Sequence, residues 1–322
     1  MSVLDFEAPI VEMEERISEL KDFSSEQSLD ISEELETLQK KLDKLKRDIY
    51  GNLTPWQRVQ IARHPQRLYT SDYIELMTED FLELHGDRLF GDDRAIIGGF
   101  ATINGQKLMI MGHQKGRDTK ENIECNFGCA NPEGYRKAMR LMKLAQQYDL
   151  PIVVLIDTPG AYPGIGGEER GQAQAIAENI RDMFSLTVPI VCCIIGEGGS
   201  GGALGVGIGD VVMMLENSYY SVISPEGCAA ILWKDAARSR DAAEALKLTS
   251  ADLLEFGIID RVIKEPLGGV HKDKVKAAAE LKKTILESIQ DLSAKKKDDL
   301  LSARYEKFRK IGQFIEEGPS GS

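Results

Sequence analysis

The first fifty residues carry a pattern of apolar and polar positions that is typical of two paired helices. Apolar side chains recur at spacings of three and four from Ile10 to Leu20, and again from Leu35 to Ile49. Mostly Glu, Lys and Asp lie between them, which places the apolar side chains on one seam of each helix. The Ser-rich, acidic stretch 23–32 suits a turn. We therefore predict a helical hairpin that either contacts a partner or braces its own domain.

The middle of the chain alternates apolar, β-branched runs with Gly-rich turns and helical patterns, which predicts a mixed α/β core. Residues 96–103 and 107–112 predict a β-hairpin about Asn104-Gly105, because Asn-Gly is a strong turn pair. Residues 132–148 predict a helix, and residues 151–156 predict a buried strand.

Two segments of this core repeat the same sequence pattern. Pro151 and Pro189 each begin a short apolar strand with the letters Pro-Ile-Val, and each strand leads into a Gly-rich loop, 160–164 and 196–202. A third strand is predicted at 211–215. Repeated strand, loop and helix units indicate a spiral of units and not an ordinary six-stranded sheet. Since the two loops follow equivalent strands, we expect 157–164 to line a cleft beside Gly201.

The last stretch, 272–318, returns to a charged helical pattern with an apolar stripe, a basic end at Lys295 to Lys297, and a Gly-Pro-Ser-Gly-Ser tail. The stripe consists of Val275, Ala279, Leu281, Ile285, Leu286 and Ile289. The predicted organisation is a helical hairpin over 1–50, an α/β core over 51–270, and a helical segment with a tail over 271–322.

Charge and cysteine content narrow the function classes. With 40 Lys+Arg and 52 Asp+Glu the formal net charge is −12, which argues against non-specific binding to nucleic acid or to an anionic membrane. No apolar run approaches the roughly twenty residues of a membrane span, and no secretory signal opens the chain. The five cysteines fit reduced thiols in the cytoplasm. Cys125 and Cys129 have ligand spacing, but nothing completes a four-ligand set, so we predict no metal.

The glycine-rich run 196–202 matches two side-chain chemistries that we weigh as alternatives. Read as Gly-x-Gly-x-x-Gly, it is a dinucleotide fingerprint with Glu216 as the ribose acid. However, only residues 202–209 separate the loop from the next strand, which is short for a parallel crossover. Read as Gly-x-Ser-x-Gly, it is a nucleophile elbow at Ser200, with His271 as the only downstream histidine.

The third alternative uses the backbone. Successive glycines let a substrate oxygen approach several peptide N–H groups at a helix start. Such an oxyanion hole stabilises an enolate or a ureido oxyanion without a catalytic side chain. A close-packed glycine turn is the structural alternative.

Six runs in order along the chain carry a family resemblance. They are Gly112-His-Gln-Lys-Gly-Arg117, Pro132-Glu-Gly-Tyr-Arg-Lys137, Ile156-Asp-Thr-Pro-Gly-Ala-Tyr-Pro-Gly164, Gly196-Glu-Gly-Gly-Ser-Gly-Gly-Ala-Leu204, Tyr220-Ser-Val-Ile-Ser-Pro-Glu-Gly227 and Pro266-Leu-Gly-Gly269. The chain resembles the carboxyltransferase α subunits of bacterial-type acetyl-CoA carboxylase over essentially its whole length. The resemblance implies a crotonase-like (ClpP/crotonase) α/β spiral with helical extensions at both ends.

The resemblance also implies the second half-reaction of that enzyme. Carboxybiotin on a biotin carboxyl carrier protein gives its carboxyl group to acetyl-CoA, forming malonyl-CoA, the first committed step of fatty acid synthesis. A β subunit completes the active site, in an α2β2 heterotetramer, and bears the zinc. ATP is used only by the separate biotin carboxylase, so no covalently bound cofactor and no metal are expected here.

By the same resemblance, the backbone N–H groups of Gly201 and Gly202 form the oxyanion hole that steadies the ureido oxygen of biotin. Further candidates for substrate contact are Gly198, Gly199, Gly160, Ala161, Tyr162, Lys115 and Arg117. For the basic loop with Lys115, Arg117 and Lys120, the alternatives are CoA phosphates, the partner, or solvent. Glu197 either caps a helix or pairs with a partner cation, and Tyr162 and Tyr219 either pack on biotin or in the core.

Two rival functions remain. One is a self-sufficient crotonase-class enzyme, and the other is a scaffold whose helical ends organise an assembly while the glycine loop only packs.

Overall fold

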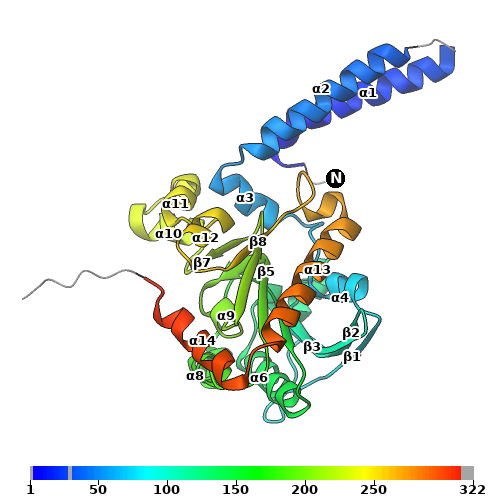
Figure 1. The fold of residues 1–322 in the computed structure, drawn as a ribbon. Helices are drawn as coiled ribbons and strands as arrows, with labels where there is room; N and C mark the ends of the chain where they lie inside the picture. The colour runs from blue at the N-terminus through cyan, green and yellow to red at the C-terminus, as the bar shows by residue number, and fades with distance from the viewer. Residues whose placement is uncertain (1–2, 28–30, 313–322) are drawn as a thin grey trace, which may run out of the picture.

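The computed structural model describes residues 3–27 and 31–312. Figure 1 shows a body built around one sheet, from which a pair of antiparallel helices projects. This N-terminal hairpin consists of α1 (Ala8–Gln27) and α2 (Ser32–Gly51), preceded by the short η1 (Asp5–Glu7). The turn predicted from Phe23 is wrong over 23–27, where α1 continues, since Ser and Glu are compatible with a helix. The rest of that turn includes 28–30, which lie outside the described residues.

The sheet runs in the order β1-β2-β3-β4-β5-β6-β8, with β7 paired to the end of β5. The β1–β2 and β2–β3 pairs are antiparallel, and the others are parallel. The predicted β-hairpin about Asn104-Gly105 is confirmed. The strands are β1 (Asp80–Glu83), β2 (Ile96–Ile103), β3 (Gln106–His113), β4 (Ile152–Thr158), β5 (Ile190–Gly199), β6 (Val211–Leu215), β7 (Tyr219–Ser221) and β8 (Arg261–Ile263).

Helices cover both faces of the sheet, because its central strands are apolar on both sides. Along β4, Val154 and Ile156 belong to the core under α6 and α8, whereas Val153 and Leu155 belong to the core under α4 and α13. The helices are α3 (Pro55–Ala62), α4 (Thr70–Met77), α5 (Thr119–Glu124), η2 (Asn126–Gly128), α6 (Pro132–Gln147), α7 (Ile165–Glu169), α8 (Gln172–Met183), α9 (Ser200–Leu204), α10 (Pro225–Trp233), η3 (Ala236–Arg238), α11 (Ser239–Leu246), α12 (Ser250–Glu255), η4 (Val270–Lys272), α13 (Lys274–Ser293) and α14 (Lys297–Arg309).

Two expectations about these elements need correction. The segment after the glycine loop does connect parallel strands, since Val191 pairs with Val211. The connection fits because β5 extends to Gly199, well beyond the residues that pair with β6. On α13, Val275 and Ala279 are exposed, and Ala277 and Ala278 are buried in their place. The helical period counted back from Leu281 selects 277 and 278.

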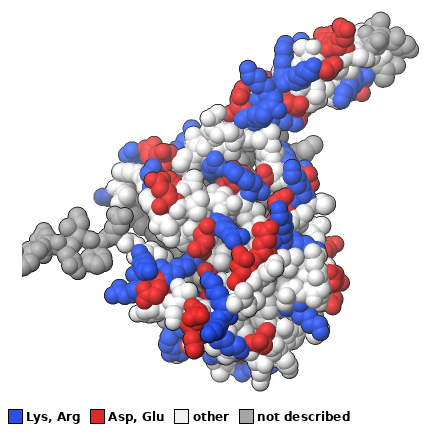
Figure 2. Space-filling model, in the orientation of Figure 1, with Lys and Arg blue, Asp and Glu red and all other residues white. Residues whose placement is uncertain are grey.

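The surface of the N-terminal hairpin carries both signs of charge, and Figure 2 shows them interspersed along it. On its inner seam, Ile10, Ile17, Leu38 and Leu42 are buried together. At its base, the Tyr50 hydroxyl donates to Glu7 Oε1 at 2.6 Å, and the carboxylate of Glu7 lies 3.5 Å from Lys272 Nζ. No helix within 3–27 and 31–312 has the length and apolar character to cross a membrane. The predicted tail, 318–322, falls outside the described residues.

Candidate functional site

The loops that follow β4 and β5 approach each other so closely that no side chain fits between their backbones. Thr158 pairs with Gly198, so the two strands deliver their loops to the same edge of the sheet. A Cβ on Gly202 would lie 2.5 Å from the carbonyl carbon of Gly160 and 2.6 Å from the nitrogen of Ala161. A Cβ on Gly199 would lie 2.2 Å from the Pro159 oxygen. The structure therefore brings the predicted glycine positions together, and their lack of side chains is what permits the contact.

Short helix α9 starts within this contact. Ser200, its first residue, has φ +49°, and Gly201 follows with only the Ile176 Cδ1 atom, at 3.7 Å, near the position of a Cβ. The first amides of a helix have no acceptor within the helix. Gly201 and Gly202 lie in this first turn, and the use of their N–H groups as an oxyanion hole stays a prediction.

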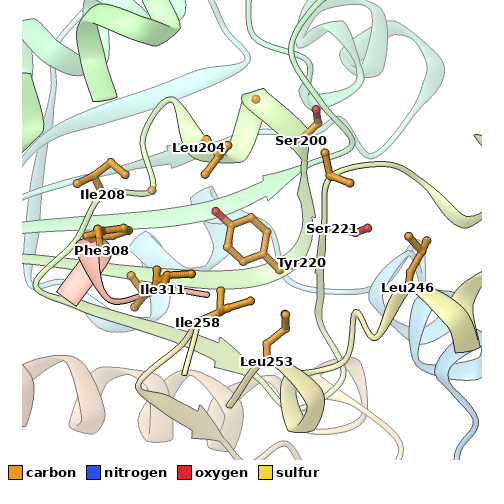
Figure 3. Close-up of a pocket in the computed structure, with 14 residues that line it drawn as sticks. Ser200, Leu204, Ile208, Tyr220, Ser221, Leu246, Leu253, Ile258, Phe308 and Ile311 are labelled. Atoms are coloured by element: carbon orange, nitrogen blue, oxygen red, sulfur yellow. The ribbon is translucent and has the colours of Figure 1, made fainter. Parts of the chain in front are cut away.

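A largely apolar cavity of about 450 Å³ opens beside Ser200 and Gly201. Figure 3 shows Leu204 and Ile208 on one side of it, Tyr220 near its centre, and Phe308 and Ile311 from the C-terminal segment on another side. Sequence reasoning missed Phe308 and Ile311, because nothing local in a charged helix indicates that its end reaches a site about one hundred residues upstream. The remaining lining residues are Gly207, Val212, Ser221, Val222, Leu246, Leu253 and Ile258.

Beneath the glycine loop lies a buried network of charged side chains. Lys115 Nζ donates to Asp157 Oδ1 at 2.6 Å and to Glu197 Oε1 at 2.8 Å. Glu197 Oε2 accepts from Arg63 Nε at 2.7 Å and from the Tyr219 hydroxyl at 2.6 Å. Glu197 therefore pairs with cations of its own chain, which corrects the expectation of a helix cap or a partner cation. Tyr219 is buried within the body, 2% exposed.

The ionisation of this network follows from its geometry. Burial alone would raise the pKa of Glu197, but the positive charges of Lys115 and Arg63 and the hydrogen bonds from Lys115 and Tyr219 lower it to about 2. Burial disfavours the ammonium of Lys115, yet the two carboxylates hold its pKa above the ordinary value. Both side chains are thus charged at neutral pH.

The three residues of the predicted basic loop lie in different surroundings. Lys115 lies in the network with a side chain 12% exposed, and Lys120 is exposed. The Arg117 guanidinium stacks 3.9 Å from the centroid of the Tyr69 ring and donates to the Pro65 and Arg67 carbonyls at 3.0 and 2.8 Å. A role for Lys115 or Arg117 in substrate binding stays a prediction.

Tyr162 is half-buried beside the first loop, with its amide donating to the Ala130 carbonyl at 3.0 Å. A Cβ on Gly164 would lie 2.5 Å from the Tyr162 ring, so the ring packs against its own loop. Its contact with biotin also stays a prediction.

The side-chain alternatives for the glycine loop find no support in the geometry. His271 stacks on the His64 ring with centroids 3.9 Å apart, and within the described chain no hydrogen bond links it to Ser200. Glu216 accepts from Lys264 at 2.6 Å, so it is already paired.

Cys125 and Cys129 are free thiols, and no set of three or more His, Cys, Asp or Glu within 3–27 and 31–312 is arranged to hold a metal ion.

Comparison with known proteins gives a consistent result over nearly the whole chain. The family described as acetyl co-enzyme A carboxylase carboxyltransferase-like matches residues 3–312. The acetyl-coenzyme A carboxylase carboxyl transferase subunit alpha of Bacillus cereus is 56% identical over 313 residues, which is 97% of each chain. The protein of the same name from Bacillus cytotoxicus is also 56% identical over 97% of each chain.

Solved structures share the fold at low identity. The transcarboxylase 12S core, solved with methylmalonyl-coenzyme A and methylmalonic acid, aligns with a TM-score of 0.55 and 19% identity, covering 80% of this chain and 44% of that one. A Pseudomonas malonate decarboxylase hetero-tetramer in complex with coenzyme A aligns with a TM-score of 0.59 and 14% identity, covering 73% of this chain and 91% of that one. The predicted crotonase-like α/β fold is thereby confirmed.

Proposed function

The chain belongs to the acetyl-CoA carboxylase carboxyltransferase family, and from that premise we propose that its loops beside Gly202 form half of a carboxyltransferase active site. The protein is a carboxyltransferase α subunit, an enzyme component of acetyl-CoA carboxylase. The reaction moves a carboxyl group from carboxybiotin to acetyl-CoA and yields malonyl-CoA for fatty acid synthesis.

The observation that carries the site assignment is the backbone contact at Gly202. It packs the first turn of α9 against the loop after β4. This close packing supports our proposal that the amides of Gly201 and Gly202 are held in place before substrate binds. Each pre-aimed donor of this kind contributes roughly 2.7–4 kcal/mol to lowering a barrier with a developing oxyanion. We assign these two amides to the ureido oxygen of biotin.

The surrounding residues complete our proposal for substrate contact. Gly198 and Gly199 on one loop, and Gly160, Ala161 and Tyr162 on the other, form the walls against which the substrate lies. Lys115 pairs with Asp157 and Glu197, so we place it as a support of the loops. Arg117 is held by the segment 65–72, and we keep it as a candidate for substrate contact.

The partners follow from the same proposal. A β subunit supplies the second oxyanion hole, for the thioester enolate, and bears the zinc, in an α2β2 assembly within the cytoplasm. The biotin carboxyl carrier protein brings carboxybiotin to the site, and ATP is consumed at the separate biotin carboxylase. Among the proteins of similar structure, the malonate decarboxylase is itself a hetero-tetramer.

The test is conversion of malonyl-CoA to acetyl-CoA with biocytin as carboxyl acceptor. The assay is run with this chain alone, with the β subunit alone, and with both. Activity only in the mixture is expected. Turnover by this chain alone would contradict the split site and favour a self-sufficient crotonase-class enzyme with Ser200 or a lone oxyanion hole.

A further inference from the structure

Strand β5 carries a bulge directly before the glycine loop. Ile156 pairs with Ile194, whereas Thr158 pairs with Gly198, so three residues of β5 lie opposite the single residue Asp157. These three, 195–197, form the bulge. A bulge re-aims the strand that carries it and leaves backbone groups without ladder partners.

Buried side chains satisfy the bulge's free backbone groups. The Ile195 carbonyl accepts from Arg67 Nε at 2.7 Å, and the Glu197 amide donates to Asp157 Oδ1 at 2.9 Å. A Cβ on Gly196 would lie 2.5 Å from the same carboxylate oxygen, so Gly196 lets Asp157 enter the bulge. The shape of the bulge is therefore set by where the Asp157 carboxylate is held.

Lys115 holds that carboxylate. Its ammonium, on a side chain 12% exposed, bridges Asp157 Oδ1 and Glu197 Oε1 and so ties the bulge to β4. Without this cation, two buried carboxylates would face each other, with Arg63 paired to Glu197 and Arg67 acting on Asp157 only through space. Such uncompensated buried charge drives rearrangement.

The distance along the chain from this anchor to the proposed oxyanion hole is short. Only Gly198, Gly199 and Ser200 lie between Glu197 and Gly201. Two of them have no side chain, so Glu197 is the last long side chain that can fix the direction of the loop. A small shift of the bulge is transmitted to the amides of Gly201 and Gly202, where misplacement by about 1 Å can lower a rate about a hundredfold.

We propose that Lys115 is a positioning residue, which locks the Asp157–Glu197 bulge and thereby aims the amides of Gly201 and Gly202. This inference rests on the proposed function for the role of those amides. It assigns Lys115 no contact with CoA phosphates.

The first experiment compares Lys115→Met with a matched control, Lys137→Met, each assembled with the β subunit. Lys137 is still more deeply buried, with a side chain 1% exposed, and it pairs with Asp92 and the Ile96 carbonyl, neither of which belongs to the glycine loop or the bulge. We expect Lys115→Met to lower kcat for malonyl-CoA decarboxylation about a hundredfold, with KM for malonyl-CoA changed less than twofold. Lys137→Met should keep kcat within about threefold. Equal kcat values for the two variants, or a Lys115→Met defect confined to KM, would overturn the proposal.

A second variant separates positioning from general loss of stability. Lys115→Met/Asp157→Asn removes the unpaired carboxylate but keeps an oxygen that can accept from the Glu197 amide. We expect kcat to recover at least fivefold over Lys115→Met. No recovery, with the double variant folded, would contradict charge-dependent positioning of the bulge.

A third measurement does not depend on catalysis. Hydrogen exchange of peptides that span 195–205 should be faster in Lys115→Met than in wild type and in Lys137→Met. Unchanged exchange would overturn the proposal even if the wild-type complex is active. Conversely, an inactive wild-type complex would defeat the proposed function, while the exchange result would still decide whether Lys115 fixes the loop.

Discussion

The N-terminal hairpin and the glycine-loop site are stabilised by opposite kinds of contact. In the hairpin, apolar side chains such as Leu42 are buried along the seam, and charges stay in solvent, as in the Lys46–Glu14 pair at 29% and 48% exposed. In the site, charges are buried and the contacting surfaces are bare backbone. The Arg67–Glu265 pair, for example, is 1% exposed on both sides.

The two regions differ in how well they tolerate substitutions. A seam of apolar side chains can absorb a change by repacking, whereas a backbone contact or a buried ion pair cannot. The hairpin can therefore vary as long as its period is kept. The geometry of the site, in contrast, depends on the positions of individual backbone and charged atoms.

The largest effect is expected at Gly202. Gly202→Ala places a methyl group against the backbone of Gly160 and Ala161, so the two loops must separate. We expect carboxyl transfer with the β subunit to fall by at least a hundredfold, as for loss of one oxyanion donor. Gly51→Ala, at the end of α2, is the control, because its Cβ meets nothing within 4 Å, and it should keep the activity. Comparable activity for both variants would show that the close approach is unimportant.

The next prediction compares the loss of stability on removing a buried charge with that on removing an exposed one. Arg67→Met leaves Glu265 buried without its cation and the Ile195 carbonyl without its donor. We expect the free energy of unfolding, from urea denaturation, to fall by about 3–5 kcal/mol. Lys46→Met in the hairpin should change it by less than about 0.5 kcal/mol. Similar losses for the two variants would remove the distinction drawn between these regions.

Leu42→Ala tests the hairpin's seam. Removing a buried Leu side chain there should lower the free energy of unfolding by about 3 kcal/mol. Activity per folded molecule with the β subunit should be unchanged, if the hairpin only braces its own domain. A loss of activity at full folding would instead identify the hairpin as a partner contact, the alternative left open by its sequence.

The smallest effect lies where the hairpin's base meets the body. Burial, together with the charges of His64 and Lys272, lowers the pKa of His271 to about 4. The folded protein therefore binds fewer protons than the unfolded chain between pH 6.5 and 4. This contribution to stability is complete above about pH 6.5 and is lost as the pH falls toward 4. His113, with a pKa lowered by burial to about 3, acts in the same direction.

His271→Phe keeps a ring on His64 and removes one titrating group. We expect its free energy of unfolding to fall less steeply than that of wild type from pH 6.5 to 4.5, by about 1 kcal/mol. Urea denaturation at several pH values measures this. Parallel curves for the two proteins would mean that His271 does not contribute.

Apolar patterns and one turn pair were sufficient to predict several of the elements. The hairpin, the β-hairpin about Asn104 and the strand at 211–215 follow from spacing, because burial on one face repeats along the chain. The stripe on α13 was misplaced at Val275, since Ala carries little hydrophobic signal and the buried face there is made by Ala277 and Ala278.

The site was predictable only in part. The glycines and Lys115 lie in long motifs, so their importance could be read from the sequence. Their arrangement could not, because Arg63, Asp157 and Glu197 come from separate segments that no local pattern joins. Charged residues in a sequence ordinarily indicate the protein surface, so burial of these side chains was not expected.

The ion-pair network has a consequence for the order of folding. Its contacts join residues 42, 82 and 134 positions apart. Closing such long loops costs chain entropy before any contact repays it, so non-local pairings slow folding. A growing chain has the N-terminal hairpin complete within its first fifty-odd residues, but it has no network until Glu197 and Tyr219 have been synthesised. The network can thus form only after about two thirds of the chain has been synthesised, and shorter products of synthesis lack it.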